Sequence, residues 1–586
     1  MKNALLALLG LMATAKGQAN RYSPLLGPVF PHAANFSSNN AFHDMTMNLT
    51  TTLEDIILAG NSTSTSRSVI NSEDTSFALQ IFSSDTIGMD NGNNTLFQWF
   101  YTSPATQNSS SGVKEVDENT VFRIGSGSKL WTVLLFLVTA GEAHLHDPVT
   151  KWVPELQAAI NAAPGDDSVD YVSWEDVTIQ ELASHLSGVG RDYAFSDLAT
   201  MDPDLTGEGF PSLSKNETPP CGVTAPCTRA QFFDGITNTH PIAPTSYTPI
   251  YSNAAIQILS YALEAITNET YDALLEEYLF EPLGLNSSYY TVPADNVGII
   301  PRNASTSLWN LSAGDETPAG GLYASIKDLS TVGRAILNNA LLSPATTRRW
   351  LKPITHTASP SYSVGAPWEI YSFENVDGRT VDLYTKSGDL GAYSSMTALL
   401  PDYNIGFTIL AAGPGTTELV AALTDAVAQS LIPALELAAR EKARQIYTGV
   451  YSGQGTDKKN SSLVISMDNG PGLKVTQWVS DSQDMLQVAE ALTGSDSLEV
   501  RLYPTALQQK RDGSCLMQSF RAVFGSPTTS NKFIGPVTGS SISWEFVDSY
   551  KYGNVGVDEF LFELDTGTGK VVSVSPRALR QTLQKA

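Results

Sequence analysis

Apolar residues recur with helical spacing in one stretch in the first third of the chain. Between residues 130 and 138 the apolar residues fall at positions i, i+3, i+4, i+7 and i+8. They are Leu130, Val133, Leu134, Leu137 and Val138. This period places them on one face of a helix and predicts that this face is buried. Gly141 follows and predicts the C-terminal end of the helix.

Similar patterns predict a mixture of helices and strands up to about residue 445. Strands are expected where aromatic and β-branched residues gather between Gly and Asn turn signals; they are 76–83, 96–101, 384–386, 394–400 and 405–411. Helical patterns cover 51–59, 178–185, 253–267, 270–278 and 418–445, and a glycine turn at 319–321 leads into another helix that runs to Leu337.

The pattern changes after Ile446. Short apolar and polar alternations separated by Gly, Asp, Asn and Ser follow, with almost no helical pattern before Pro576. This predicts a separate domain of β type over 446–586. A chain of 586 residues is too long for one hydrophobic core. Residues 20–50 are irregular and rich in Asn, Ser and Pro, which predicts an N-terminal extension before a main domain at 51–445.

The first residues have the organisation of a secretory signal peptide. A short basic segment precedes the apolar run Ala4–Ala15, and small residues end the segment at Ala19. We expect cleavage near Ala19, with Ala13–Ala15 as the alternative site. The apolar run is too short to span a bilayer, and no later stretch approaches about 18 uninterrupted apolar residues. The expected location is therefore extracellular, without a membrane anchor.

Glycosylation signals agree with secretion. Asn-x-Ser/Thr sequons without a central proline begin at Asn35, Asn48, Asn61, Asn93, Asn108, Asn216, Asn268, Asn286, Asn303, Asn310 and Asn460. This density in a chain with a signal peptide predicts a glycoprotein.

Charge and cysteine content limit the classes of partner and cofactor that can be expected. The net charge is -25, which argues against nucleic acid and anionic membranes as partners. Cys221 and Cys227 bracket a short Gly/Pro loop and are expected to form a disulfide in an oxidising compartment, which leaves Cys515 free. His144 and His146 have no second pair to complete a metal site, so neither a metal nor another cofactor is expected.

Ser126 and Lys129 stand where the apolar helix begins. Three residues apart, they share a helix face. The hydroxyl lies in the positive field of the helix N-terminus, and a buried amine of lowered pKa could take its proton. The alternative is a serine-capped core helix with a solvated lysine. Two other Ser-x-x-Lys sequences, at 111–114 and 212–215, precede no apolar helix.

Further motifs follow in a fixed order. Tyr251-Ser-Asn253 opens a helix, Ala319-Gly-Gly forms a turn, and Lys386-Ser387-Gly388 lies on a strand. With Ser126-x-x-Lys129, they resemble the serine β-lactamase and penicillin-binding-protein superfamily, in its branch of class C β-lactamases, D-Ala-D-Ala carboxypeptidases, esterases and D-aminopeptidases. The phrases 120–125, 186–189 and 281–285 are also similar. The chain looks like a secreted, fungal-type member, and the resemblance covers roughly 50–440.

This resemblance implies an α+β fold (an α/β sandwich), with a central antiparallel sheet flanked by an all-helical region. It also implies a role for each motif residue. Ser126 would attack, and Lys129 would receive or polarise its proton. Tyr251 would protonate the leaving group, its pKa depressed by the ammonium groups of Lys129 and Lys386. Asn253 would hold Lys129 and the substrate in place.

The strand at Lys386 would complete the site. The backbone N–H groups of Ser126 and Asp389 would form the oxyanion hole. Ser387 and Gly388 would border the substrate, the glycine because it has no Cβ in the way. Lys386 stands where many esterase-like members have His, which favours substrates with a carboxylate or another polar group. The Asp389 side chain would repel anionic substrates, so these two cues conflict.

Two regions lie outside these motifs. The segment 191–247 is unusually long for a connection in a compact domain, which predicts a lid or binding loop that decides the substrate. The C-terminal region from Tyr447–Tyr451 onward resembles the lipocalin-like β-barrels appended to some D-aminopeptidases. Such a barrel would shape access to the site.

These inferences predict a secreted, cofactor-independent serine hydrolase that acts on a small-molecule or peptide-like ester or amide through a Ser126 acyl-enzyme. One alternative is an acyltransferase of secondary metabolism, which delivers the acyl group to an alcohol; the signal peptide argues against it. A second alternative is a non-catalytic binding module. The joint retention of the four motifs argues against that.

Overall fold

The computed structural model describes residues 24–32, 36–60, 70–85, 95–162, 167–195, 197–201, 205–215, 217–222, 225–374, 379–454, 460–494, 498–511, 513–525 and 543–586. The predicted signal peptide and the sequons at Asn35, Asn61, Asn93 and Asn216 lie outside these ranges. The chain divides into two compact units. One contains Asp44–Phe373 and Asp382–Ser430, and the other contains Met1–His43, Glu374–Val381 and Leu431–Ala586.

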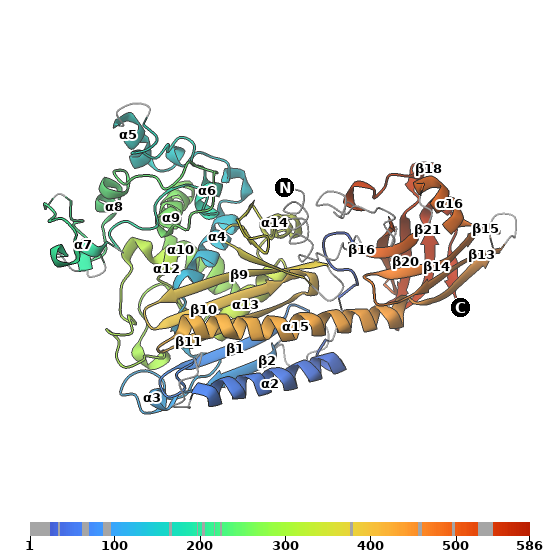
Figure 1. Cartoon of the computed structure of the whole chain (residues 1–586), viewed down its shortest axis with the longest axis horizontal. Coiled ribbons are helices and arrows are strands. Elements are labelled where there is room, and N and C mark those ends of the chain that lie inside the picture. Colours follow the sequence, from blue (N-terminus) through green and yellow to red (C-terminus); the bar gives the residue numbers. More distant parts are fainter. Residues whose placement is uncertain are drawn as a thin grey trace, which may run out of the picture. The chain divides into compact units, whose positions relative to one another are not determined.

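The first unit is built on an antiparallel sheet with the strand order β2-β1-β11-β10-β9-β8-β7-β6 (Figure 1). Its strands are β1 Ser76–Ser83, β2 Thr95–Tyr101, β6 Thr355–His356, β7 Tyr362–Val364, β8 Glu369–Glu374, β9 Thr380–Leu390, β10 Tyr393–Leu400 and β11 Ile405–Ala412. Every residue of β1, β10 and β11 is buried, including the polar residues Gln80, Ser394, Ser395, Thr397 and Thr408. Helix α13, Ile326–Leu337, packs across these three strands.

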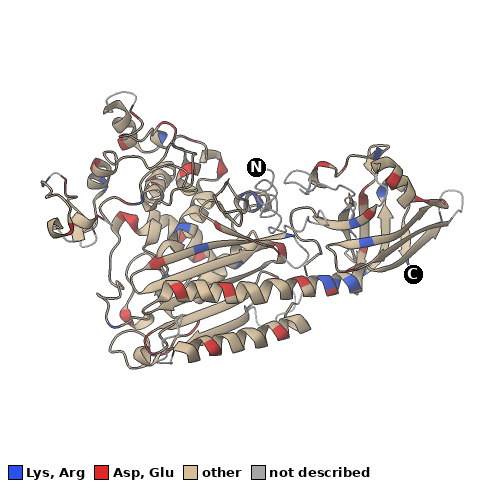
Figure 2. Cartoon of the chain, in the orientation of Figure 1, with Lys and Arg blue, Asp and Glu red and all other residues tan. Residues whose placement is uncertain are grey.

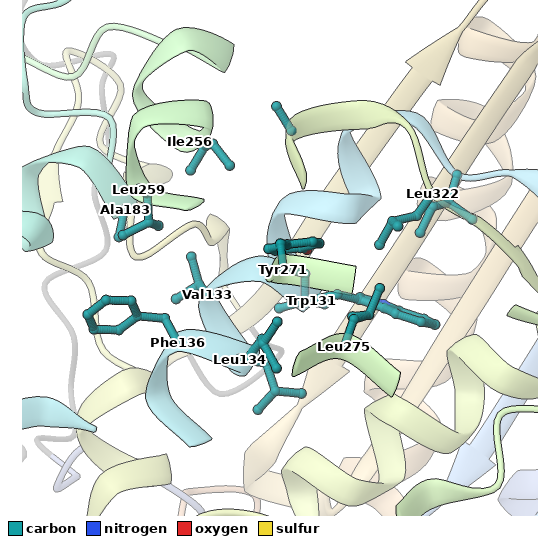
Figure 3. Close-up of a cluster of buried hydrophobic side chains, with 14 of the residues drawn as sticks. Trp131, Val133, Leu134, Phe136, Ala183, Ile256, Leu259, Tyr271, Leu275 and Leu322 are labelled. Atoms are coloured by element: carbon teal, nitrogen blue, oxygen red, sulfur yellow. The ribbon is translucent and has the colours of Figure 1, made fainter. Parts of the chain in front are cut away.

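A helical region surrounds helix α4, Ser128–Thr139. Every residue of α4 from Ser128 to Leu137 is buried, so this helix is covered on all sides. Its side chains Trp131, Val133, Leu134 and Phe136 meet residues of α6 (Ile179–Ala183), α9 (Asn253–Thr267) and α10 (Tyr271–Leu275) in one core (Figure 3). The predicted apolar helix is therefore the centre of this region.

A small sheet connects this helical core to the nucleophile. Strand β3, Val121–Arg123, pairs with β5, Tyr323–Ser325, which also pairs with β4, Ser288–Tyr289. The chain leaves β3 and passes through the 3₁₀ turn η2, Gly125–Gly127, into α4. The remaining helices of this region are α3 Pro104–Gln107, α5 Pro154–Ala162, α7 Leu198–Met201, α8 Arg229–Ile236, α11 Glu281–Leu283, α12 Thr317–Gly320 and α14 Pro344–Trp350.

The C-terminal strands close into a barrel. Their order is β13-β12-β22-β21-β20-β17-β16-β14, and β13 also pairs with β14. They are β12 Gly449–Gln454, β13 Asn460–Ser466, β14 Leu473–Ser480, β16 Glu499–Arg511, β17 Cys515–Gly525, β20 Glu559–Asp565, β21 Lys570–Pro576 and β22 Leu583–Lys585. Buried Trp478, Phe520, Phe560 and Phe562 pack in its core. The barrel expected from the sequence is thus confirmed.

Two expectations about local structure were wrong. Residues 40–50 are not irregular, because Asn40–Gly60 form the single helix α2, which buries Met45, Leu49 and Leu53 at a spacing of four residues. Within the C-terminal region, helix α16, Met485–Thr493, stands where hardly any helix was expected. Elsewhere, the helix predicted after the glycine turn at 319–321 is preceded by β5.

Helix α15, Thr416–Tyr447, is the one described helix whose length and apolar composition would allow it to cross a membrane. However, 56% of its most apolar window is buried inside the fold, as in a core helix. Acidic residues outnumber basic ones 60 to 35 in the sequence, and Figure 2 shows them spread along the chain. The sequon residues that the structure describes are all exposed: Asn48, Asn108, Asn268, Asn286, Asn303, Asn310 and Asn460.

Candidate active site

The turn η2 holds Ser126 just before α4, not in the first turn of the helix as expected. Gly125 has a φ of 51°, a conformation that favours glycine. Ser128 Oγ donates to the Gly125 carbonyl at 2.7 Å, and Ser395 Oγ on β10 donates to the Ile124 carbonyl at 2.7 Å. These two bonds fix the backbone that leads into Ser126.

Lys129 is fully buried, with 0% of its surface exposed. Its Nζ lies 2.9 Å from Ser126 Oγ, 2.5 Å from Asn253 Oδ1 and 2.5 Å from the Ala319 carbonyl oxygen. Burial lowers the pKa of Lys129, and the nearby ammonium group of Lys386 lowers it further against the opposing effect of Tyr251. The amine is thus placed, and shifted in pKa, as a base for the Ser126 hydroxyl requires.

Tyr251 lies between the two lysines. Its ring centroid is 4.9 Å from Lys129 Nζ and 5.3 Å from Lys386 Nζ. Burial alone would raise the pKa of the phenol, but the two ammonium groups and hydrogen bonding to Lys129 and Ser126 outweigh it, so the pKa lies below its usual value of 10.0. The structure therefore brings the five predicted catalytic residues together.

A carboxylate that sequence reasoning missed binds Lys386. Glu369, on β8, accepts from Lys386 Nζ at 2.5 Å with Oε1 and from the Ser387 backbone N–H at 2.9 Å with Oε2. Lys386 also donates to the Ser387 carbonyl at 2.7 Å and is only 1% exposed. Burial opposes its charge, but Glu369 and Tyr251 outweigh this effect and raise the pKa of Lys386. The preference for carboxylate substrates was expected because of an ammonium group at Lys386. The structure shows no exposed ammonium group there.

Gly388 is needed for a different reason from the one expected. A Cβ at this position would lie 2.1 Å from the Ile124 carbonyl oxygen and 2.7 Å from the Ser126 nitrogen, so the turn fills the space that was assigned to substrate. A Cβ on Gly125 would similarly lie 2.7 Å from the Asp389 nitrogen. The backbone N–H groups of Ser126 and Asp389, the predicted oxyanion donors, thus belong to two segments in direct contact.

The Asp389 side chain is bound to its neighbours. Its Oδ1 accepts from Ser394 Oγ at 2.5 Å and from Thr417 Oγ1 at 2.7 Å, and the residue is exposed. The residue also lines the cavity described below. That its charge repels anionic substrates stays a prediction.

His185 is a second residue that sequence reasoning missed. Its ring stacks on Tyr251 at a centroid distance of 4.5 Å, and its Nδ1 accepts from the Ser252 backbone N–H at 3.2 Å. Burial, together with the charges of Lys129, Lys386 and Arg191, holds the pKa of His185 well below its usual value. A neutral imidazole therefore supports the phenol ring from one side.

Asp192 and Glu316 form an acidic pair behind Asn253, and the sequence analysis assigned neither of them. Asn253 Nδ2 donates to Asp192 Oδ1 at 2.7 Å. Burial raises the pKa of Glu316 to about 8, and the charge of Asp192 and a hydrogen bond to it act in the same direction. Glu316 therefore holds a proton at neutral pH. The available signal was position, because Asp192 stands three residues after the phrase 186–189 and Glu316 stands three residues before Ala319-Gly-Gly.

A cavity of about 150 Å³ opens beside the nucleophile. Its walls include Ser126, Asn253, Asp192, Phe195, Glu316 and Asp389. A second, smaller cavity shares Phe195, Ala313 and Glu316 with the first and reaches Tyr193 and Cys227. The 191–247 segment thus lines the space beside Ser126. The disulfide between Cys221 and Cys227 is present as predicted, and Cys515, which is outside any disulfide, donates from Sγ to Glu563 Oε1 at 3.2 Å.

The alternative Ser-x-x-Lys sequences lie in different surroundings. Lys114 and Lys215 are both exposed, whereas Lys129 is buried. Within the described ranges, no group of three His, Cys, Asp or Glu side chains is placed to hold a metal ion. His144 instead pairs through Nδ1 with Asp147 Oδ2 at 2.8 Å.

Comparison with known proteins identifies the family. The Beta-lactamase family model matches residues 86–432, and the model of the Beta-lactamase-like-like, C-terminal domain matches 439–586. The chain therefore belongs to the β-lactamase-like hydrolase family.

Its relatives include full-length fungal proteins. A "Beta-lactamase-like protein" of Arthroderma benhamiae is 28% identical over 583 residues, which cover 94% of each chain. A "Probable hydrolase M10" of a Phoma species is 26% identical, over 87% of this chain and 86% of the relative. Among solved structures, the octameric penicillin-binding protein homologue from Pyrococcus abyssi aligns over 92% of this chain and 100% of its own, with 16% identity and a TM-score of 0.46.

Proposed function

We propose that this protein is a serine hydrolase that cleaves an ester or amide through an acyl-enzyme on Ser126. The observation that carries the proposal is the contact of 2.9 Å between Ser126 Oγ and the fully buried Nζ of Lys129. A hydroxyl becomes a nucleophile when a positioned base takes its proton, and burial lowers the pKa of this amine as that role requires.

In the acylation step, Ser126 Oγ forms a bond to the carbonyl carbon of the substrate while its proton passes to Lys129. The negative charge that develops on the carbonyl oxygen is stabilised by the backbone N–H groups of Ser126 and Asp389. The bond to the leaving group then breaks, and Tyr251 supplies the proton that the departing alcohol or amine needs. Its lowered pKa suits this exchange near neutral pH.

Deacylation reverses these roles with water as the nucleophile. Tyr251 takes a proton from water, the hydroxyl oxygen attacks the ester carbon, and the bond to Ser126 Oγ breaks. The oxygen of Ser126 recovers its proton from Lys129, and the acid product leaves. The protein's own groups hold and move every proton in this scheme.

The proposed setting is extracellular, with glycans on the chain. The disulfide at Cys221–Cys227 and the exposure of every described sequon asparagine support this proposal. A fall in apparent mass after treatment of the secreted protein with an N-glycosidase is the expected result. An unchanged mass would contradict glycosylation.

Labelling with a fluorophosphonate probe, followed by peptide mass spectrometry, tests the reaction. We expect one adduct on the peptide that contains Ser126, absent in Ser126→Ala and retained in Ser212→Ala, which alters one of the alternative sequences. No adduct on the folded protein would refute the proposal. Profiling over esters, D-amino acid amides and β-lactams, with and without an alcohol as acyl acceptor, then identifies the substrate and separates hydrolysis from acyl transfer.

A further inference from the structure

The hydrogen-bond partners of Lys129 Nζ constrain where its lone pair points. A neutral amine has two hydrogens and one lone pair. Asn253 Oδ1 and the Ala319 carbonyl, both at 2.5 Å, are pure acceptors and must receive the two hydrogens. The other two partners, Ser126 Oγ at 2.9 Å and the phenol of Tyr251, are hydroxyl groups that can donate. The lone pair therefore faces the side of the amine where Ser126 lies, which is the geometry a general base needs.

This arrangement depends on one orientation of the Asn253 amide. If the amide were reversed, its NH₂ group would face Lys129 Nζ and compete for the lone pair. The side chain that decides the orientation is Asp192, whose Oδ1 lies 2.7 Å from Asn253 Nδ2. A carboxylate only accepts, so it can face only the NH₂ end of the amide and leaves the carbonyl end to Lys129.

Asp192 is itself held in place. Its side chain is only 5% exposed, and Arg191 Nε lies 3.6 Å from its Oδ2. Glu316 hydrogen-bonds to it as the protonated partner of the pair. These contacts hold the side chain with its Oδ1 toward Asn253 Nδ2.

We propose that Asp192 is a positioning residue, which fixes the amide of Asn253 so that the lone pair of Lys129 points at Ser126. The proposal rests on the proposed function and deepens it. Asp192 acts through Asn253 and makes no contact with the reacting atoms in this scheme, so its effect is on the rate at which Ser126 is acylated.

The test compares two substitutions at the same position. Asp192→Leu has a similar shape and no acceptor, whereas Asp192→Asn can still turn its carbonyl oxygen toward Asn253 Nδ2. We expect the fluorophosphonate labelling rate of Ser126 to fall by about 100-fold in the Leu variant, because a small misplacement of a reacting group costs this much. The Asn variant should retain most of the rate. Asp315→Asn, an exposed neighbour of Glu316 outside the cavity walls, is the control for charge removal.

The pH profile separates positioning from a loss of folding. In Asp192→Leu, Lys129 meets an amide that can reverse and present its NH₂ group to the amine, and this disfavours the ammonium form. The midpoint of the labelling rate should therefore move to lower pH while the maximum rate falls. Partial unfolding would lower the rate without moving the midpoint. If Leu prevents folding, Asp192→Ala is measured instead, with the folded fraction taken from circular dichroism.

The outcomes are distinguishable. Labelling of Asp192→Leu, or of its Ala substitute, at the wild-type rate and midpoint overturns the positioning role while the proposed function stands. Equal loss in the Asn and Leu variants also overturns it, because the acceptor would then not be the feature that matters. If wild-type Ser126 is not labelled, the proposed function fails and the inference fails with it.

Discussion

Gly388 and Ser126 are in backbone contact: a Cβ on residue 388 would lie 2.7 Å from the Ser126 nitrogen. The same atom would lie 2.1 Å from the Ile124 carbonyl oxygen, and real Cβ atoms do not approach backbone this closely. The strand that carries Lys386 is thus set directly against the turn that carries the nucleophile. The relative placement of the two motifs depends on the absence of one methyl group.

Gly388→Ala should therefore separate the two motifs. The turn or the strand must move, because backbone atoms cannot give way as a flexible side chain can. We expect the labelling rate of Ser126 to fall by about 100-fold, since displacements near 1 Å have effects of this size. Gly190→Ala is the control, because a Cβ there meets no atom within 4 Å. A wild-type labelling rate in Gly388→Ala would contradict the described contact.

The ion pair between Lys386 and Glu369 should dominate the stability of this edge of the site. Glu369→Gln leaves the ammonium of Lys386, 1% exposed, without its counter-charge. Breaking a buried pair in this way costs about 3 kcal/mol of unfolding free energy. Urea denaturation measures the loss.

The matched control for the pair of Lys386 and Glu369 is an ion pair exposed to solvent. Lys327 and Glu118 lie 3.2 Å apart with side chains 51% and 35% exposed. Glu118→Gln should change the unfolding free energy by less than about 1 kcal/mol, because solvent screens such pairs. Equal effects of the two substitutions would show that Lys386 does not depend on Glu369.

Periodicity predicts the elements that are buried on one face or flanked by clear turns. Residues 76–83 and 253–267 were predicted with the bounds that the structure has for β1 and α9. The first half of helix α2, residues 40–50, was missed because Asn and Thr residues separate the apolar positions Met45 and Leu49, whereas the second half was predicted as a helix over 51–59. The physical reason is that tertiary burial, which the local sequence does not contain, stabilises such a helix.

The residues of the candidate site also divide into those that the sequence predicts and those that it does not. Residues in motifs, such as Ser126 and Lys129, could be found because their spacing along one element carries the chemistry. The sequence did not reveal three acidic residues: Asp192, Glu316 and Glu369. Each of them acts on a motif residue from a different part of the fold. Single acidic residues have no spacing to recognise, and their roles arise only from hydrogen bonds such as that between Asn253 and Asp192.

The disulfide should stabilise the segment that lines the cavities. Cys221 and Cys227 close a loop with a sequence separation of 6. Loop-closure entropy predicts that Cys221→Ser with Cys227→Ser lowers the unfolding free energy by about 2 kcal/mol. Thermal denaturation measures this effect, with Cys515→Ser as the control that replaces the cysteine outside the disulfide. A double variant as stable as the wild type would show that the loop is held by other contacts.

Glu316 should make stability fall as the pH rises. Its pKa is about 8 in the folded protein, against a usual value of 4.5, so the folded state holds a proton that the unfolded state has released between these two pH values. Stability decreases with pH wherever the folded state binds more protons. Glu316→Gln keeps a donor for Asp192 and removes this titration. We expect the melting temperature of the variant, relative to wild type, to rise between pH 5 and pH 8; an unchanged difference would contradict the raised pKa of Glu316.

Lys129 should act on stability in the opposite direction. Its pKa is lowered by burial, so between the folded value and 10.5 the unfolded state binds more protons and wild-type stability increases with pH. Lys129→Met abolishes labelling of Ser126 and also removes this increase. The absolute stability is a poor readout, because Met leaves Asn253 Oδ1 and the Ala319 carbonyl without their donor, and each such loss costs about 1–3 kcal/mol. The change in unfolding free energy with pH, in contrast, is specific to the titration of Lys129. The difference in unfolding free energy between Lys129→Met and wild type should shift in favour of the wild type as the pH approaches 10, as measured by urea denaturation at several pH values. Parallel pH profiles of the two proteins would mean that Lys129 titrates in the folded state as it does in water, and would remove its candidacy as the base for Ser126.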